Sequence, residues 1–155
     1  ECHFIGPSHP TKTRPIAAHF SWVHSVDRLK IAQRLNEQRP DDLPPLNICV
    51  QVNIDDETTK SGVALADLPE LVAAIQPLPR LQLRGLMAIP AATNNPAQQR
   101  AAFAKLRNAL AALNEQGFAL DCLSMGMSGD MEAAIAEGAT FVRVGTDIFG
   151  ARAAL

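Results

Sequence analysis

Short apolar runs alternate along this chain with segments in which apolar residues recur at helical spacing. The runs rich in Val, Ile and Leu predict six strands, over residues 2–6, 22–26, 47–54, 81–89, 121–127 and 140–145. Several of these runs are apolar at consecutive positions. That pattern is typical of strands buried on both faces, as in a parallel sheet.

The helical segments are predicted at residues 27–38, 66–75, 96–116 and 130–137. Asp27 is the expected N-cap of the first of these helices. The third has the clearest ends, because Asn95 suits an N-cap, Pro96 the first helical position, and Gly117 the C-terminal stop. Gln98 is placed to close a capping box with Asn95.

This alternation of strands and helices predicts an α/β fold with a parallel sheet. An open doubly wound sheet and a (β/α)8 barrel both fit the order. No GxGxxG or Walker A pattern supports the doubly wound alternative. A barrel takes about 250 residues, so we expect residues 1–155 to form one domain, an incomplete TIM barrel of about six βα units that lacks the first two.

Composition narrows the classes of function. The chain has 14 basic and 16 acidic residues with no basic stripe, which argues against nucleic-acid binding. No apolar run is long enough for a membrane span. The three cysteines form no CxxC pair, so neither a zinc site nor a disulfide framework is indicated. We therefore expect a cytoplasmic protein with reduced cysteines, no metal site and no membrane partner.

Small and hydroxyl-bearing residues follow the last two predicted strands. Ser128 comes directly after one strand and precedes a helix, and Gly145 and Thr146 come at the end of the next. Each stretch alone would be an ordinary cap or turn. Together they predict a phosphate cup, because the loops after the last two strands of a barrel commonly hold a phosphate. Asp130 is expected to face away and to stabilise the helix N-terminus.

Arg143 lies inside an apolar strand, between Val142 and Val144. Strand alternation places Phe141, Arg143 and Gly145 on one face, so the arginine is expected to point inward. A buried arginine needs a partner. That partner is either a structural carboxylate or an acceptor on a ligand.

Other polar groups are weaker candidates. The acidic run at 55–57 is too closely spaced for a compact set of metal ligands and is better interpreted as a solvated loop. The four histidines show no metal-binding spacing, and His3 is expected to be a satisfied core residue.

Several motifs together resemble the pyridoxal phosphate homeostasis protein family. They are "HFIG", "VNI" with "KSG", "RGLMAI", "LSMGMSGDMEAAIAEGAT" and "VRVGTDIFGAR", and they extend over nearly the whole chain. The resemblance implies a (β/α)8 barrel of the alanine racemase N-terminal type that binds pyridoxal 5′-phosphate. It implies a cofactor carrier or regulator without an established catalytic turnover.

The resemblance also implies roles for individual residues. Ser128, with Met127 beside it, corresponds to the phosphate-binding serine, and Gly145 and Thr146 to the phosphate contacts after the last strand. Arg143 corresponds to the arginine that faces the pyridine nitrogen. An arginine cannot accept a proton there, so the ring nitrogen stays unprotonated and the cofactor is a weakened electron sink.

The chain departs from the family pattern in two places. None of its lysines matches the motif of the family's Schiff-base lysine, and the loop at residues 6–14 is divergent. The expected partners are pyridoxal phosphate and the apoenzymes that use it, and the expected full-length state is a monomer. An alanine-racemase-like enzyme acting on amino acids is the alternative, although the sequence has no Tyr that could act as the catalytic tyrosine. A barrel for another phosphorylated metabolite, with a purely structural Arg143, also remains open.

Overall fold

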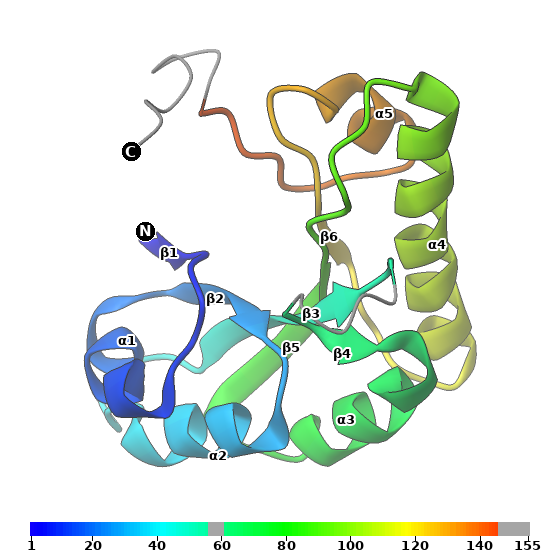
Figure 1. Ribbon diagram of the computed structural model, residues 1–155. Coiled ribbons are helices and arrows are strands. Elements are labelled where there is room, and N and C mark those ends of the chain that lie inside the picture. Colours follow the sequence, from blue (N-terminus) through cyan, green and yellow to red (C-terminus); the bar gives the residue numbers. More distant parts are fainter. Residues whose placement is uncertain (56–60, 146–155) are drawn as a thin grey trace.

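A curved parallel β-sheet lies at the centre of the structure (Figure 1). The computed structural model describes residues 1–55 and 61–145. Within these ranges the sheet runs in the order β1-β2-β3-β5-β6, and a short β4 pairs with β3. The strands are β1 His3–Phe4, β2 Trp22–Val26, β3 Leu46–Asn53, β4 Val63–Ala64, β5 Leu81–Met87 and β6 Cys122–Ser124. Each described pairing is parallel, which confirms the predicted α/β class.

Helices follow the strands and cover the outer side of the sheet. They are α1 Thr13–His19, α2 Leu29–Gln38, α3 Leu68–Ile75, α4 Pro96–Glu115 and α5 Met131–Ala136, with 3-10 turns at Pro10–Lys12 and Leu65–Asp67. Figure 1 shows α1, α2 and α3 below the sheet and the long α4 to its right. No described helix is long and apolar enough to cross a membrane.

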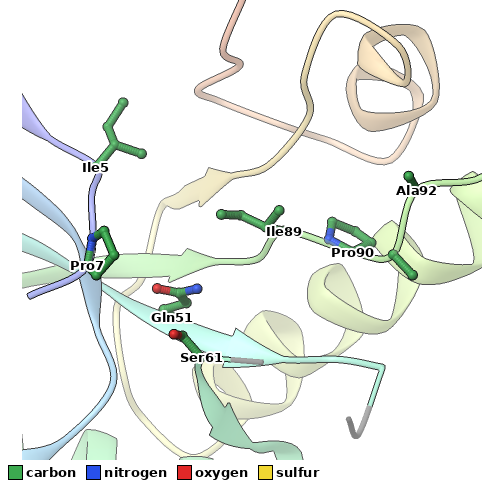
Figure 2. A pocket seen from close by; sticks show the side chains of 8 residues that line it. Ile5, Pro7, Gln51, Ser61, Ile89, Pro90 and Ala92 are labelled. Carbon is green, nitrogen blue, oxygen red and sulfur yellow. The ribbon is translucent and has the colours of Figure 1, made fainter. Parts of the chain in front are cut away.

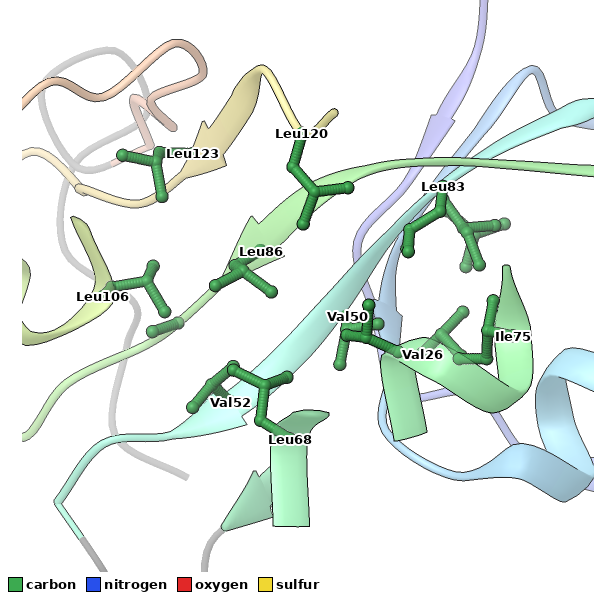
Figure 3. Packing of buried hydrophobic residues seen from close by; sticks show 14 of the residues in the cluster. Val26, Val50, Val52, Leu68, Ile75, Leu83, Leu86, Leu106, Leu120 and Leu123 are labelled. Carbon is green, nitrogen blue, oxygen red and sulfur yellow. The ribbon is translucent and has the colours of Figure 1, made fainter. Parts of the chain in front are cut away.

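The two faces of the sheet carry different packing. Outward side chains of β3, such as Val50 and Val52, pack with Leu68 and Ile75 of α3 in a large apolar core (Figure 3). The concave face carries a smaller cluster of buried residues, Trp22, Cys49, Met87 and Cys122, against which Ile5 and Phe141 pack. The strands are therefore buried on both faces, as their consecutive apolar residues predict.

The sixth predicted strand, at residues 140–145, is present only as an isolated parallel bridge between Ser124 and Phe141. The reason lies in the neighbouring strand. Gly126 has a φ of 104°, in the left-handed region, so β6 cannot continue to residue 127 as predicted. A Cβ at Gly126 would lie 2.6 Å from the Cβ of Ala134, so the turn also lets α5 pack closely.

The helix ends agree with the sequence in part. The side chain of Asn95 caps α4 by accepting from the N–H groups of Ala97 and Gln98, as predicted. The predicted capping box is wrong, because Gln98 accepts from the hydroxyl of Thr93 instead. Asp27 is not the N-cap of α2, since its carboxylate accepts from Gly62 N at 3.1 Å. Neither α1 nor β4 was expected from the pattern of apolar residues.

Candidate functional site

Three polar side chains on the concave face of the sheet, joined at one end by Glu1, form a hydrogen-bonded chain. Nδ1 of His24, on β2, lies 2.7 Å from the hydroxyl oxygen of Ser124, on β6. Nε2 of His24 lies 2.9 Å from Nδ1 of His3, on β1, and the other ring nitrogen of His3 reaches a carboxylate oxygen of Glu1 at 3.2 Å. Because β2 and β6 are not neighbours in the sheet, the contact between His24 and Ser124 spans its concave side.

Aromatic rings surround this chain. The ring of His3 stacks on Trp22 with 5.3 Å between centroids and 4° between planes. Phe141 packs edge-on against Trp22 at 5.0 Å and against His24 at 5.1 Å. His3 was expected to be a core residue whose polar atoms have hydrogen-bond partners. Both of its ring nitrogens do have partners, although its side chain is 24% exposed.

Arg143 lies close enough to this aromatic cluster for its charge to act on His24. The pKa of His24 is lowered to about 4. Burial is the largest cause, followed by the charge of His3 and then by the positive charge of Arg143. Nε and Nη2 of Arg143 are buried and have no hydrogen-bond partner among the described residues. Burial lowers the pKa of Arg143, and the negative charge of Asp130 opposes that effect. Arg143 is thus a half-buried cation with two buried nitrogens that donate to no described acceptor.

The loops after the last two predicted strands meet as expected. The N–H of Gly145 donates to the hydroxyl oxygen of Ser128 at 3.2 Å. A Cβ on Gly129 or Gly145 would meet no described atom within 4 Å, so no described residue crowds either glycine. Thr146, the fourth predicted contact, lies outside the described residues.

Asp130 does not face away from this loop. Its carboxylate accepts from the N–H of Met127 at 2.7 Å and makes no cap hydrogen bond to α5. Asp130 is the N-cap residue of α5, as its expected place at the helix N-terminus requires, but its side chain closes the turn that presents Ser128. Met127 is 47% exposed, a large apolar side chain beside the serine.

Two hollows lie near the carboxyl ends of the strands. One, of about 400 Å³, is lined by Ile5, Pro7, Gln51, Ser61 and residues 89–92, as Figure 2 shows. Gln51 is 8% exposed, and its amide is the polar group that β3 contributes to this hollow. Sequence reasoning missed Gln51, because an isolated Gln in an apolar strand has no distinguishing pattern.

The other hollow, of about 540 Å³, lies between the N-terminal part of α4 and α5. Ser128, Gly129 and Asp130 line one side of it, and Gln99 and Arg100 line the other. Among the predicted site residues that the structure describes, Ser128 alone lines either hollow.

Other polar groups near the concave face have structural partners. The guanidinium of Arg84 lies 4.8 Å from the centroid of Trp22 and forms hydrogen bonds with both carboxylate oxygens of Asp121. That contact holds the pKa of Asp121 below its usual value. Cys49 and Cys122 are free buried thiols whose pKa values are raised by burial, to about 11 for Cys122. These groups are poor candidates for nucleophiles.

Comparison with known proteins decides the family. The model of the alanine racemase N-terminal domain matches residues 2–153. The chain belongs to the alanine racemase N-terminal domain family. Within this family it is similar to the pyridoxal phosphate homeostasis protein of Pseudomonas aeruginosa, with 65% identity over 150 residues, and to that of Escherichia coli K12, with 56% identity over 152 residues. These matches confirm the family resemblance of the motifs.

The alignments cover 97% and 98% of this chain but only 64% and 65% of the two relatives. The chain therefore spans just under two thirds of their length. The structure of PipY from Synechococcus elongatus, solved with PLP bound, superimposes with a TM-score of 0.86 at 37% identity, covering 96% of this chain and 69% of PipY. The alanine racemase family and this superposition establish a TIM-barrel-like α/β fold.

Proposed function

We propose that this chain binds pyridoxal 5′-phosphate and takes part in the homeostasis of that cofactor. The observation that carries the proposal is Arg143, whose buried Nε and Nη2 lack an acceptor among the described residues. A pyridine nitrogen is an uncharged acceptor that such a group can satisfy. The names of the Pseudomonas and Escherichia relatives and the PLP bound in PipY support the same ligand.

The residues described here fit the two ends of that cofactor. Ser128 and Gly145, whose hydroxyl oxygen and N–H lie 3.2 Å apart, are proposed as phosphate contacts, and no described atom would crowd a phosphate beside Gly145. Thr146 is proposed as a further phosphate contact and Met127 as an apolar neighbour. Arg143 donates to the ring nitrogen and, being permanently charged, keeps that nitrogen unprotonated. When bound, pyridoxal phosphate supplies a reactive aldehyde and an electron-withdrawing ring.

The proposal assigns this chain a holding role and no covalent attachment of the cofactor. Of its lysines, Lys12, Lys30 and Lys105 are exposed, and Lys60 lies outside the described residues. We propose a carrier or regulator, with apoenzymes that use the cofactor as recipients.

We also propose that residues 1–155 are a single domain contributing six βα units to a (β/α)8 barrel, in a monomeric cytoplasmic protein. The βα units from β1 to α5 and the bridge at Phe141 support this count. Light scattering on the protein as its gene encodes it would test the monomer. A dimer at micromolar concentration would contradict it.

Titration with pyridoxal phosphate, followed by absorbance and equilibrium dialysis, tests the function. Ser128→Ala removes one hydrogen bond to a charged phosphate, worth about 1.5–3 kcal/mol, and should weaken binding roughly 10- to 100-fold. Arg143→Gln should weaken binding of pyridoxal phosphate. The affinity of the same site for inorganic phosphate, measured by its competition with pyridoxal phosphate, should stay unchanged. The matched control is Arg14→Gln, an exposed position on α1.

The same titration separates the cofactor from other ligands. A phosphorylated metabolite that does not contact Arg143 would bind equally well to wild type and Arg143→Gln. If both site variants retain pyridoxal phosphate as tightly as wild type, the assigned phosphate cup and ring contact are wrong.

A further inference from the structure

The backbone around Arg143 has little regular structure to hold it. The parallel bridge to β6 involves Phe141 alone, and beyond it the N–H of Arg143 donates to the carbonyl of Gly126 at 3.0 Å. Gly126 itself is in a left-handed turn. The location of the Arg143 side chain therefore depends on other contacts of this segment. Phe141, two residues away, makes ring contacts with three side chains.

The ring of Phe141 sits in a box of three aromatic side chains. Its centroid lies 5.0 Å from Trp22, 5.1 Å from His24 and 5.5 Å from His3. The interplanar angle with His24 is 82°, an edge-to-face contact of the kind that adds stability beyond burial. We refer to His3, Trp22 and His24 as the aromatic box.

His24 is the most buried member of the aromatic box, with 2% exposure against 5% for Trp22. Both of its ring nitrogens are engaged, one with Ser124 at 2.7 Å and the other with His3 at 2.9 Å. Ser124 is also the residue that forms the bridge with Phe141. A rotation of the His24 ring would therefore break two hydrogen bonds and open the wall against which Phe141 rests.

The charges around His24 favour its neutral form. Burial, and then the charges of His3 and Arg143, lower the pKa of His24, while Glu1 pairs with His3. A neutral His24 places no second positive charge beside Arg143, on which the negative charge of Asp130 also acts. The guanidinium therefore keeps its N–H groups available for an uncharged acceptor.

On the basis of the cofactor site proposed above, we propose that His24 is a positioning residue for Arg143. Through its hydrogen bonds to Ser124 and His3 it fixes the aromatic box, the box fixes Phe141, and Phe141 places the guanidinium against the pyridine nitrogen. His24 does not touch the cofactor in this arrangement.

A double-mutant cycle with pyridoxal phosphate binding tests the proposal. His24→Asn should weaken binding about 10-fold in the wild-type background but less than twofold when Arg143 is already Gln, because the group that it positions is gone. Ser124→Ala, which removes one hydrogen bond and little volume, is the milder second variant and should show the same non-additivity. Full additivity of His24→Asn with Arg143→Gln would overturn the proposal.

A second readout does not require the cofactor. The Nε–Hε signal of Arg143 in the NMR spectrum of the cofactor-free protein should shift or broaden in His24→Asn and Ser124→Ala, while the Arg14 signal stays unchanged. An unchanged Arg143 signal in both variants would overturn the positioning role. If wild type failed to bind pyridoxal phosphate but these shifts were seen, the proposed function would be wrong and the positioning of Arg143 by His24 would stand.

Discussion

Acid should destabilise this protein through His24 well before most carboxylates are protonated. The side chain is 2% exposed, and burial, His3 and Arg143 lower its pKa from 6.5 to about 4. Between pH 6.5 and about pH 4, His24 therefore binds a proton in the unfolded chain but not in the folded protein. The stability present above pH 6.5 is lost as the pH falls toward 4.

The size of this effect follows from the pKa difference. Each pH unit inside the window costs about 1.4 kcal/mol, so the free energy of unfolding should fall by about 2.5 kcal/mol between pH 7.5 and pH 4.5. Urea denaturation at a series of pH values measures that slope. The Asp121 carboxylate, whose pKa is lowered by Arg84, loses its contribution only below 3.8 and does not interfere.

The His24→Asn variant is the control, because it removes the titrating group at that position. Its absolute stability will differ from that of wild type, so the comparison is between the two pH slopes. We expect the variant to lose about 2.5 kcal/mol less than wild type over the same interval. Parallel slopes for the two proteins would show that His24 is not held neutral by its surroundings and would refute the reasoning.

Four further substitutions test packing, the α4 cap and a buried ion pair. Gly85→Ala should abolish soluble expression, because the new Cβ would lie 1.8 Å from the carbonyl oxygen of Cys122 in the adjacent strand. Gly129→Ala is the control: its Cβ would meet no described atom within 4 Å, so the variant should melt within about 2 °C of wild type. Asn95→Ala should lower the free energy of unfolding by about 1 kcal/mol in urea, through loss of the α4 cap, and no change would contradict the capping role. Glu137→Gln should lower the free energy of unfolding by about 2 kcal/mol in the same assay, because this 7%-exposed carboxylate pairs with Arg100 and Arg107 of α4. A variant as stable as wild type would show that these ion pairs do not contribute to stability.

The family motifs and apolar runs made much of the fold predictable. Five of six strands and four helices were expected near their observed positions, because burial on both sheet faces and helical periodicity leave local patterns. The α1 helix was missed since prolines interrupt its sequence, although Pro15 stands in the first turn, where the missing N–H costs little. The sixth predicted strand, at residues 140–145, did not form beyond its bridge at Phe141, because the left-handed turn at Gly126 ends its partner strand β6.

The sequence by itself determined the alternation of strands and helices, the meeting of Ser128 with Gly145, and the burial of Nε and Nη2 of Arg143. These follow from local apolar patterns and from the order of the strands. Only the tertiary structure decided that His24 meets Ser124, because the two residues are 100 positions apart and belong to strands that are not neighbours. Their contact depends on the curvature of the sheet, which brings β2 and β6 to face each other and which no pattern in either segment records.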